Sequence, residues 1–177
     1  MLKIKRTIAQ VKNLLGFSCV NVQTVMTAKK KVWNPATLAY EYTGDKRVVK
    51  NKCVTDAFVA LLIDSLQAQA TPLANLALFK YHDCGTGTSD EAAENTSLGT
   101  PFGGARVEGN QIEGSSGNIY KSVATITFSE ELSITEHGLF NASTSGTLMD
   151  RTKFTAINVL ATNQIEFTFE ITFTSGG

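Results

Sequence analysis

Residues 164–173 read QIEFTFEITF, in which apolar and polar residues alternate without interruption. The apolar positions are Ile165, Phe167, Phe169, Ile171 and Phe173, and the polar positions between them are Glu166, Thr168, Glu170 and Thr172. A period of two puts the apolar side chains on one face of a β-strand. The stretch is rich in aromatic and β-branched residues and has no proline. It therefore predicts an interior strand of an antiparallel sheet that packs on one side only.

Three preceding segments, at residues 122–128, 132–140 and 152–160, have the same character. In the first of them, Ala124, Ile126 and Phe128 share one face of the expected strand. Short runs of turn residues at 130–131, 141–146 and 161–163 separate the segments. Strands at this spacing are typical of an antiparallel β-sandwich, built either as a meander or as a Greek key. The predicted fold is mainly β.

The first half of the chain carries shorter strand signals, and strands are expected at residues 18–26, 38–42 and 47–49. We expect the first turn where Lys29-Lys30-Lys31 precedes Asn34-Pro35. The second turn is expected at Gly44-Asp45, a pair that suits a tight hairpin.

A helix is expected next, because Thr55 or Asp56 can cap an apolar periodic run that continues to about Gln67. Its predicted buried stripe consists of Val54, Phe58, Leu61, Leu62 and Leu66. Pro72 disfavours continuation of the helix past Thr71. Residues 76–81 are expected to return to the sheet.

Residues 1–16 are predicted to form a basic N-terminal arm, ahead of a single β-sandwich domain at 17–177 with its helix near 55–67. Ile4, Ile8, Val11 and Leu15 recur at helical spacing, and Lys3, Lys5, Arg6 and Lys12 lie mostly off that stripe. A basic amphipathic helix can lie on a membrane or dock in a protein groove, and an extended arm or an edge strand is the alternative. We predict that the arm docks onto protein and that its four cations form an interface.

The zero net charge of the 177-residue chain is the sum of two opposed parts. Residues 1–53 carry 11 Lys and Arg against 2 acids, a net charge of +9, and the remainder carries −9. Such asymmetry suggests association between chains, and a solvated basic face is the alternative. Nucleic acid is disfavoured as a partner, because the cations are dispersed and Trp33 is the only tryptophan for base stacking.

His82-Asp83-Cys84 is the cluster that comes nearest to reactive chemistry. Neighbouring side chains of an extended chain point to opposite faces, so Asp83 could not orient His82 while His82 activates Cys84. His82 and Cys84 could share a metal ion, but only His137 and two distant cysteines are available to complete the site. We interpret the cluster as a strand end that feeds a glycine loop, with no catalytic, cofactor or metal residue. In a reducing cytoplasm, the three cysteines, Cys19, Cys53 and Cys84, are expected to be small buried hydrophobes rather than a disulfide framework.

The glycine loop that follows also lacks a cofactor signature. Gly85-Thr86-Gly87-Thr88 has neither the third glycine of a dinucleotide fingerprint nor the Gly-Lys-Ser/Thr of a phosphate loop. The acids Asp90, Glu91 and Glu94 come just after it. Their carboxylates leave cation binding open, although no EF-hand spacing supports it.

Residues 100–118 contain five glycines and few large apolar side chains. They predict a long exposed loop or a loose hairpin, with short strands near 106–108 and 111–113. Because long loops on a rigid sandwich often carry contacts, we predict a second interface at Arg106, Glu108, Gln111 and Glu113.

Several motifs resemble a module that is common in small structural proteins of tailed bacteriophages. HGLFN at 137–141, GTLMDR at 146–151 and FTAINV at 154–159 precede the final alternating strand. Upstream, VKNKCVTD at 49–56, CGTGT at 84–88 and NTSLG at 95–99 fit the same module. The resemblance covers roughly residues 48–173 and is a pattern of packing and turn residues without a catalytic signature.

The resemblance implies a non-enzymatic virion structural protein without a cofactor, assembled in the host cytoplasm. The leading expectation is a capsid decoration or cement protein: a homo-oligomer, for instance a trimer, that binds the major capsid protein and stabilises the head shell. The alternative is a neck, tail or tail-fibre component that acts as an adaptor or a receptor-binding module on another virion protein. A hydrolase of cell-surface glycan is disfavoured because no carboxylate pair stands out. A membrane partner is disfavoured because no apolar run approaches the ~18 residues of a span, and the N-terminus lacks the apolar core of a secretory signal.

Overall fold

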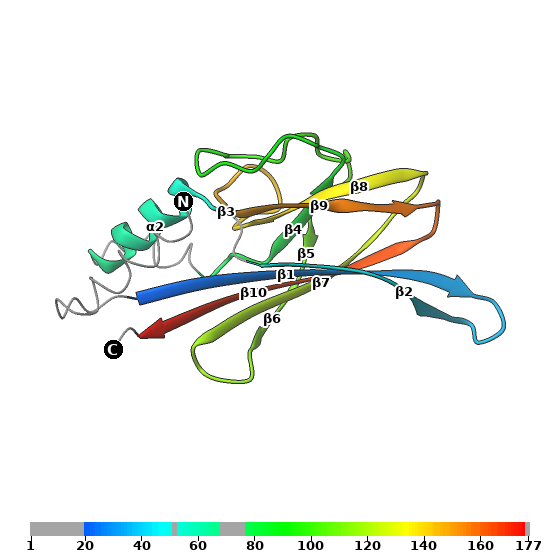
Figure 1. Cartoon of the computed structure of the whole chain (residues 1–177), viewed down its shortest axis with the longest axis horizontal. Coiled ribbons are helices and arrows are strands. Elements are labelled where there is room, and N and C mark those ends of the chain that lie inside the picture. The colour runs from blue at the N-terminus through cyan, green and yellow to red at the C-terminus, as the bar shows by residue number, and fades with distance from the viewer. Residues whose placement is uncertain (1–19, 51–52, 68–76, 176–177) are drawn as a thin grey trace, which may run out of the picture.

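A computed structural model describes residues 20–50, 53–67 and 77–175, and these form two five-stranded antiparallel sheets packed as a sandwich (Figure 1). The first sheet has the order β2 (Ala39–Lys50), β1 (Val20–Asn34), β10 (Gln164–Ser175), β7 (Ile119–Thr127) and β6 (Asn110–Glu113). The second has the order β3 (Cys53–Val54), β9 (Leu148–Val159), β8 (Leu132–Phe140), β4 (Tyr81–Gly85) and β5 (Val107–Glu108). The predicted mainly β sandwich is confirmed.

β10 is the central strand of the first sheet, as its alternating sequence predicts. It pairs with β1 on one side and with β7 on the other. Phe167 and Phe169 are fully buried between the sheets, whereas Glu166 and Thr168 point to the outer face and are half-buried. The face shared by Ala124, Ile126 and Phe128 is also buried. Apolar burial at these positions supplies the main driving force for closing the sandwich.

The four C-terminal strands do not run as one meander through a single sheet. β7 pairs with β10 in the first sheet, and β8 pairs with β9 in the second. The connections from β7 to β8 and from β9 to β10 therefore cross between the sheets. Side chains from consecutive segments meet across the core.

The first predicted turn is right at Asn34-Pro35 but wrong at the three lysines, and the second predicted turn is wrong. Lys29-Lys30-Lys31 lies inside β1, because Lys29 and Lys31 use the polar face of the strand to contact Glu166 of β10. Gly44-Asp45 lies inside β2, where Gly44, at a φ of +85°, sits in an irregularity of the pairing with β1. The turn is at residues 35–38, and β1 and β2 form one long hairpin (Figure 1).

The helix α2 (Asp56–Leu66) begins at the predicted cap, where Thr55 Oγ1 accepts a hydrogen bond from the Phe58 amide at 3.2 Å. Phe58 is buried, but Leu66 is 76% exposed and does not belong to the buried stripe. The buried side instead follows Phe58, Leu61 and Ser65, and Leu66 lies about 100° around the helix from Ser65. α2 lies at the end of the sandwich opposite to the β1–β2 turn (Figure 1).

The segment expected to re-enter the sheet at residues 76–81 is displaced, because β4 begins only at Tyr81 and contains His82, Asp83 and Cys84. Residue 76 lies outside the described residues, as do the predicted arm at 1–16 and Cys19.

In the described part of the chain, no helix is both long enough and apolar enough to span a bilayer.

Candidate functional site

The two histidines, which lie far apart in the sequence, meet in the core. His82 Nδ1 lies 2.9 Å from His137 Nε2, and His82 Nε2 lies 2.8 Å from Ser122 Oγ of the opposite sheet. The His137 ring stacks on Phe167 at 4.7 Å between centroids. Burial lowers the pKa of His82 to about 3 and holds the pKa of His137 well below its usual value. Both rings are neutral and fully buried, so they join the two sheets and do not face a substrate.

The other members of the β4 cluster are also part of the structural core. Cys84 is a free, fully buried cysteine, and burial raises the pKa of its thiol well above the usual value. A thiol in that state is a poor nucleophile. The Asp83 carboxylate lies 3.6 Å from Arg106 Nε, and the Arg106 guanidinium lies 3.4 Å from the centroid of the Phe140 ring. Arg106 Nη1 also donates to the carbonyls of Ala142 and Ser145. Arg106, predicted as an interface residue, is thus engaged within the fold.

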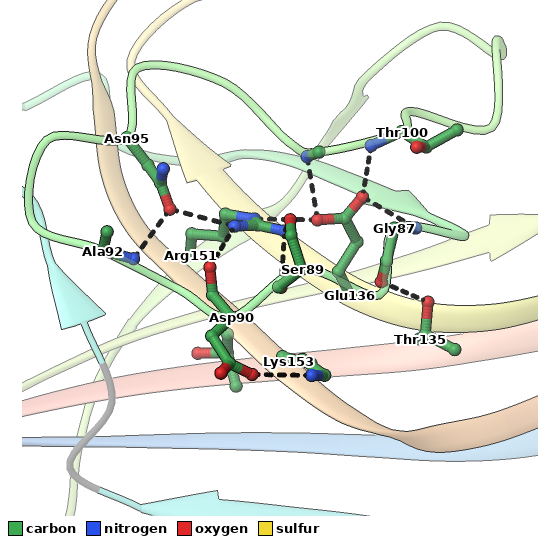
Figure 2. Close-up of polar contacts among 12 residues, drawn as sticks. Gly87, Ser89, Asp90, Ala92, Asn95, Thr100, Thr135, Glu136, Arg151 and Lys153 are labelled. Carbon is green, nitrogen blue, oxygen red and sulfur yellow. Dashed lines mark hydrogen bonds and ion pairs between the residues drawn. The ribbon is translucent and has the colours of Figure 1, made fainter.

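A buried ion pair joins β8 to β9 on the side of the second sheet that faces away from the first (Figure 2). Glu136 Oε2 accepts from Arg151 Nε at 2.8 Å and from the Gly99 amide at 2.9 Å. Glu136 Oε1 accepts from the amides of Gly87 and Thr100, at 3.0 and 2.7 Å. Burial alone would raise the pKa of Glu136, but these bonds and Arg151 outweigh burial, and the pKa is lowered. We call this pair the Glu136–Arg151 clasp.

The arginine of the clasp satisfies its remaining N–H groups with the same loop. Arg151 Nη1 donates to the Asp90 carbonyl and to Asn95 Oδ1, and Nη2 donates to the carbonyl and the hydroxyl of Ser89. With the Glu136 contact, all five guanidinium donors are used. The clasp therefore fixes residues 87–100 on the sheet (Figure 2). The glycine loop has a structural role, since the Gly87 amide already binds Glu136.

The buried carboxyl group of Asp150 has few hydrogen-bond partners. Its Oδ1 accepts from Thr152 Oγ1 at 2.5 Å, and its Oδ2 has no hydrogen-bond partner among the described residues. Burial, together with the charge of Glu91, raises the pKa of Asp150 to about 7. Asp90 of the acidic loop lies 2.8 Å from Lys153 Nζ. Across residues 20–50, 53–67 and 77–175, no cluster of three or more His, Cys, Asp or Glu side chains is placed to hold a metal ion.

The other predicted interface residues stay predictions. Glu108 is exposed, with its carboxylate 2.5 Å from Lys80 Nζ. Gln111 is exposed and donates to the Tyr120 hydroxyl at 3.0 Å. The side chain of Glu113 and the four cations of the arm lie outside what the structure describes.

Sequence reasoning missed the most prominent exposed feature, which is the outer part of the β1–β2 hairpin. The last β1 residue that pairs with β10 is Lys31, so residues 32–41 pair only with one another. We call these residues the ribbon. Trp33 and Tyr40 lie opposite each other as an edge-to-face pair at 5.3 Å, and Leu38 at the tip is 74% exposed. Trp33 is 45% exposed. The available signal was the pair of aromatic residues on either side of the predicted Asn34-Pro35 turn.

The ribbon has an ordered tip and an anchored base. In the tip, Asn34 Nδ2 and Thr37 Oγ1 both donate to the Glu41 carboxylate, at 2.9 and 2.6 Å. Beyond the base of the ribbon, Arg47 of β2 donates to the carbonyls of Thr155 and Ala156 of β9, at 2.9 and 2.7 Å, and so anchors the hairpin to the second sheet. These contacts support a preorganised ribbon.

Part of the charge asymmetry of the sequence is balanced within the chain. Lys31 Nζ lies 2.7 Å from the Glu166 carboxylate and 4.7 Å from the centroid of the Tyr42 ring. Lys29 Nζ lies 3.9 Å from Glu166, and the Tyr42 hydroxyl donates to the same carboxylate at 2.8 Å. Half-buried lysines of the basic first third thus meet an acid of the C-terminal strand in the same molecule.

Comparisons with protein-family models, with curated proteins and with solved structures find no match to this chain. Any function assigned to it rests on the geometry above and on the resemblance of its motifs.

Proposed function

We propose that this protein is a non-enzymatic structural component of a tailed-phage particle, that it decorates the head shell, and that the ribbon seats it there. The observation that carries the proposal is the exposure of Trp33, Leu38 and Tyr40 on the ribbon, where β1 and β2 pair only with each other. Tryptophan and tyrosine are the residues most enriched among those that dominate binding energy at protein interfaces. Their placement on a projecting, internally bonded hairpin lowers the entropy that binding would cost.

The backbone at the tip of the ribbon adds a second argument. Leu38 has a φ of +52°, in the left-handed region that glycine or asparagine adopts more easily. For a residue with a Cβ that conformation costs roughly 1–2 kcal/mol. A contact with a partner would explain why a large apolar side chain is exposed on a strained backbone.

The buried polar groups support the non-enzymatic part of the proposal. His82 binds His137 and Ser122, and Glu136 binds Arg151 together with three backbone amides. These groups are buried and committed to holding the sheets and the 87–100 loop.

The proposal is tested with Trp33→Ala/Tyr40→Ala in a sedimentation assay with empty heads that lack the protein. We expect wild type to sediment with the heads and the double variant to remain largely in the supernatant, because it loses the aromatic anchors. Val48→Ala is the matched control, since Val48 is an exposed apolar residue of β2 that lies outside the ribbon and outside both predicted interfaces. Equal binding by the double variant would exclude the ribbon as the contact.

The head assignment is tested separately by the copy number in purified particles. Gel densitometry should give an amount of this protein comparable to that of the major capsid protein. A much smaller amount, typical of neck and tail components, would contradict head decoration while leaving a structural role in the particle.

A further inference from the structure

α2 is apolar around almost its entire circumference. In DAFVALLIDSL the polar residues are Asp56, Asp64 and Ser65. One side packs into the core, where the Phe58 ring meets that of Phe79 edge to face at 5.2 Å. On another side Val59, Ile63 and Leu66 are exposed, at a spacing of four and three residues that places them in one stripe. A helix that is apolar all round is normally covered on every side, so this stripe lacks a cover among the described residues.

The stripe adjoins an apolar pocket at the same end of the sandwich. The pocket has a volume of about 150 Å³ and is lined by Phe58, Leu62, Tyr120, Met149, Ile171 and Phe173. It lies between α2 and strands of both sheets. Together the stripe and the pocket rim offer an apolar surface to a second helix.

The chain enters the described fold beside this pocket. Val22 of β1 is the cross-strand partner of Phe173, which lines the pocket, and Val20 pairs with Ser175. Figure 1 shows the start of β1 at the same end as α2. Residues 16–19 separate Leu15 from Val20, and the five extended steps from Leu15 to Val20 reach at most about 18 Å. The amphipathic segment that ends at Leu15 is therefore tethered close to the stripe.

We propose that residues 4–15 of the same chain pack as a helix on α2, with Ile4, Ile8 and Val11 against the stripe. Twelve helical residues measure about 18 Å, and the 11 residues of α2 measure about 16 Å, so the two lengths match. Charge favours the pairing, because α2 contains two Asp and no cation while residues 1–19 contain four cations and no acid. The short tether gives the segment an effective concentration on the order of millimolar.

This docking leaves Lys3, Lys5, Arg6 and Lys12 mostly on the outer side of the segment, because they lie off its apolar stripe. The docked arm would present a basic surface at the end of the molecule opposite to the ribbon. The inference concerns the isolated chain and goes beyond the proposed function. It is tested without any particle, so either proposal can fail alone.

The test is amide hydrogen exchange followed by mass spectrometry on the full-length protein, with a free peptide of residues 1–19 as the reference. In wild type we expect the amides of residues 4–15 to exchange at least about tenfold more slowly than in the peptide. Val59→Gln/Ile63→Gln should return them to the peptide rate, because it replaces the stripe with polar side chains that retain helix propensity. Leu160→Gln is the control, since Leu160 is exposed in the turn before β10, at the ribbon end.

A second variant covers the case in which the α2 substitutions disturb the fold. Ile8→Gln/Val11→Gln changes only the segment and should also restore fast exchange, with protection of β10 unchanged. Peptide-like exchange in wild type, or protection that survives both double variants, would overturn the proposal. Protection that falls on dilution would overturn it as well, because the segment would then be bound to a second copy.

Discussion

Replacing Glu136 with glutamine should test whether the Glu136–Arg151 clasp holds the second sheet and its loop together. The carboxylate accepts four hydrogen bonds, from Arg151 and from the amides of Gly87, Gly99 and Thr100. A glutamine offers one oxygen and places an NH₂ group against two of those donors. Arg151 is almost fully buried, so it would be left without its counter-ion.

The expected loss follows from these contacts. Removing one partner of a buried ion pair costs about 3–5 kcal/mol, because the other charge stays buried. We expect Glu136→Gln to lower the free energy of unfolding by about 4 kcal/mol, within that range. The pKa of Glu136 is lowered in the fold, so its contribution is present above its ordinary pKa and is lost as the pH falls. The variant should lack this part of the acid sensitivity.

Urea unfolding followed by circular dichroism measures this loss. Adding Arg151→Met to Glu136→Gln should cost at least about 1 kcal/mol less than the sum of the single changes, because the unpaired cation is gone. Glu108→Gln is the control, since its ion pair with Lys80 is exposed to solvent and should contribute little to stability. A loss below about 1.5 kcal/mol for Glu136→Gln, or strict additivity of the pair, would refute the reasoning.

Three further outcomes are expected. Phe169→Ala should lower the free energy of unfolding, measured in denaturant, by about 3–5 kcal/mol, because a fully buried ring is removed from the core. A loss under about 1 kcal/mol would mean that the ring is not packed there. Asp150 keeps its proton in the fold up to a pKa of about 7, so wild type should lose up to about 4 kcal/mol as the pH rises from about 4 to 7. Asp150→Asn should not show that loss, so its free energy of unfolding should compare more favourably with that of wild type at pH 8 than at pH 4. Urea unfolding measures both, and a difference between the two proteins that does not change with pH would contradict the raised pKa. Leu38→Gly should raise the melting temperature slightly, because glycine adopts a positive φ without strain. The same variant should bind heads more weakly, and undiminished binding would show that the Leu38 side chain is not used.

Local periodicity determined the mainly β class and the positions of several elements. The alternation at residues 164–173 placed β10 with its buried and outer faces, and Thr55 marked the start of α2. Each of these features depends on a side-chain pattern within one element and on a backbone preference that acts over a few residues. Such signals are present in the sequence regardless of what the element later packs against.

Tertiary structure alone decided the ribbon and the clasp. Lys29-Lys30-Lys31 has the composition of a turn, but Glu166 lies beside it in the sheet and gives two of the lysines a partner within a strand. Glu136 and Arg151 belong to different strands, and only the pairing of β8 with β9 brings them together under the 87–100 loop. Their hydrogen bonds join groups from 15 to 62 positions apart in sequence. Contacts of that range depend on strand register, and register is set by the assembled core and not by any one segment.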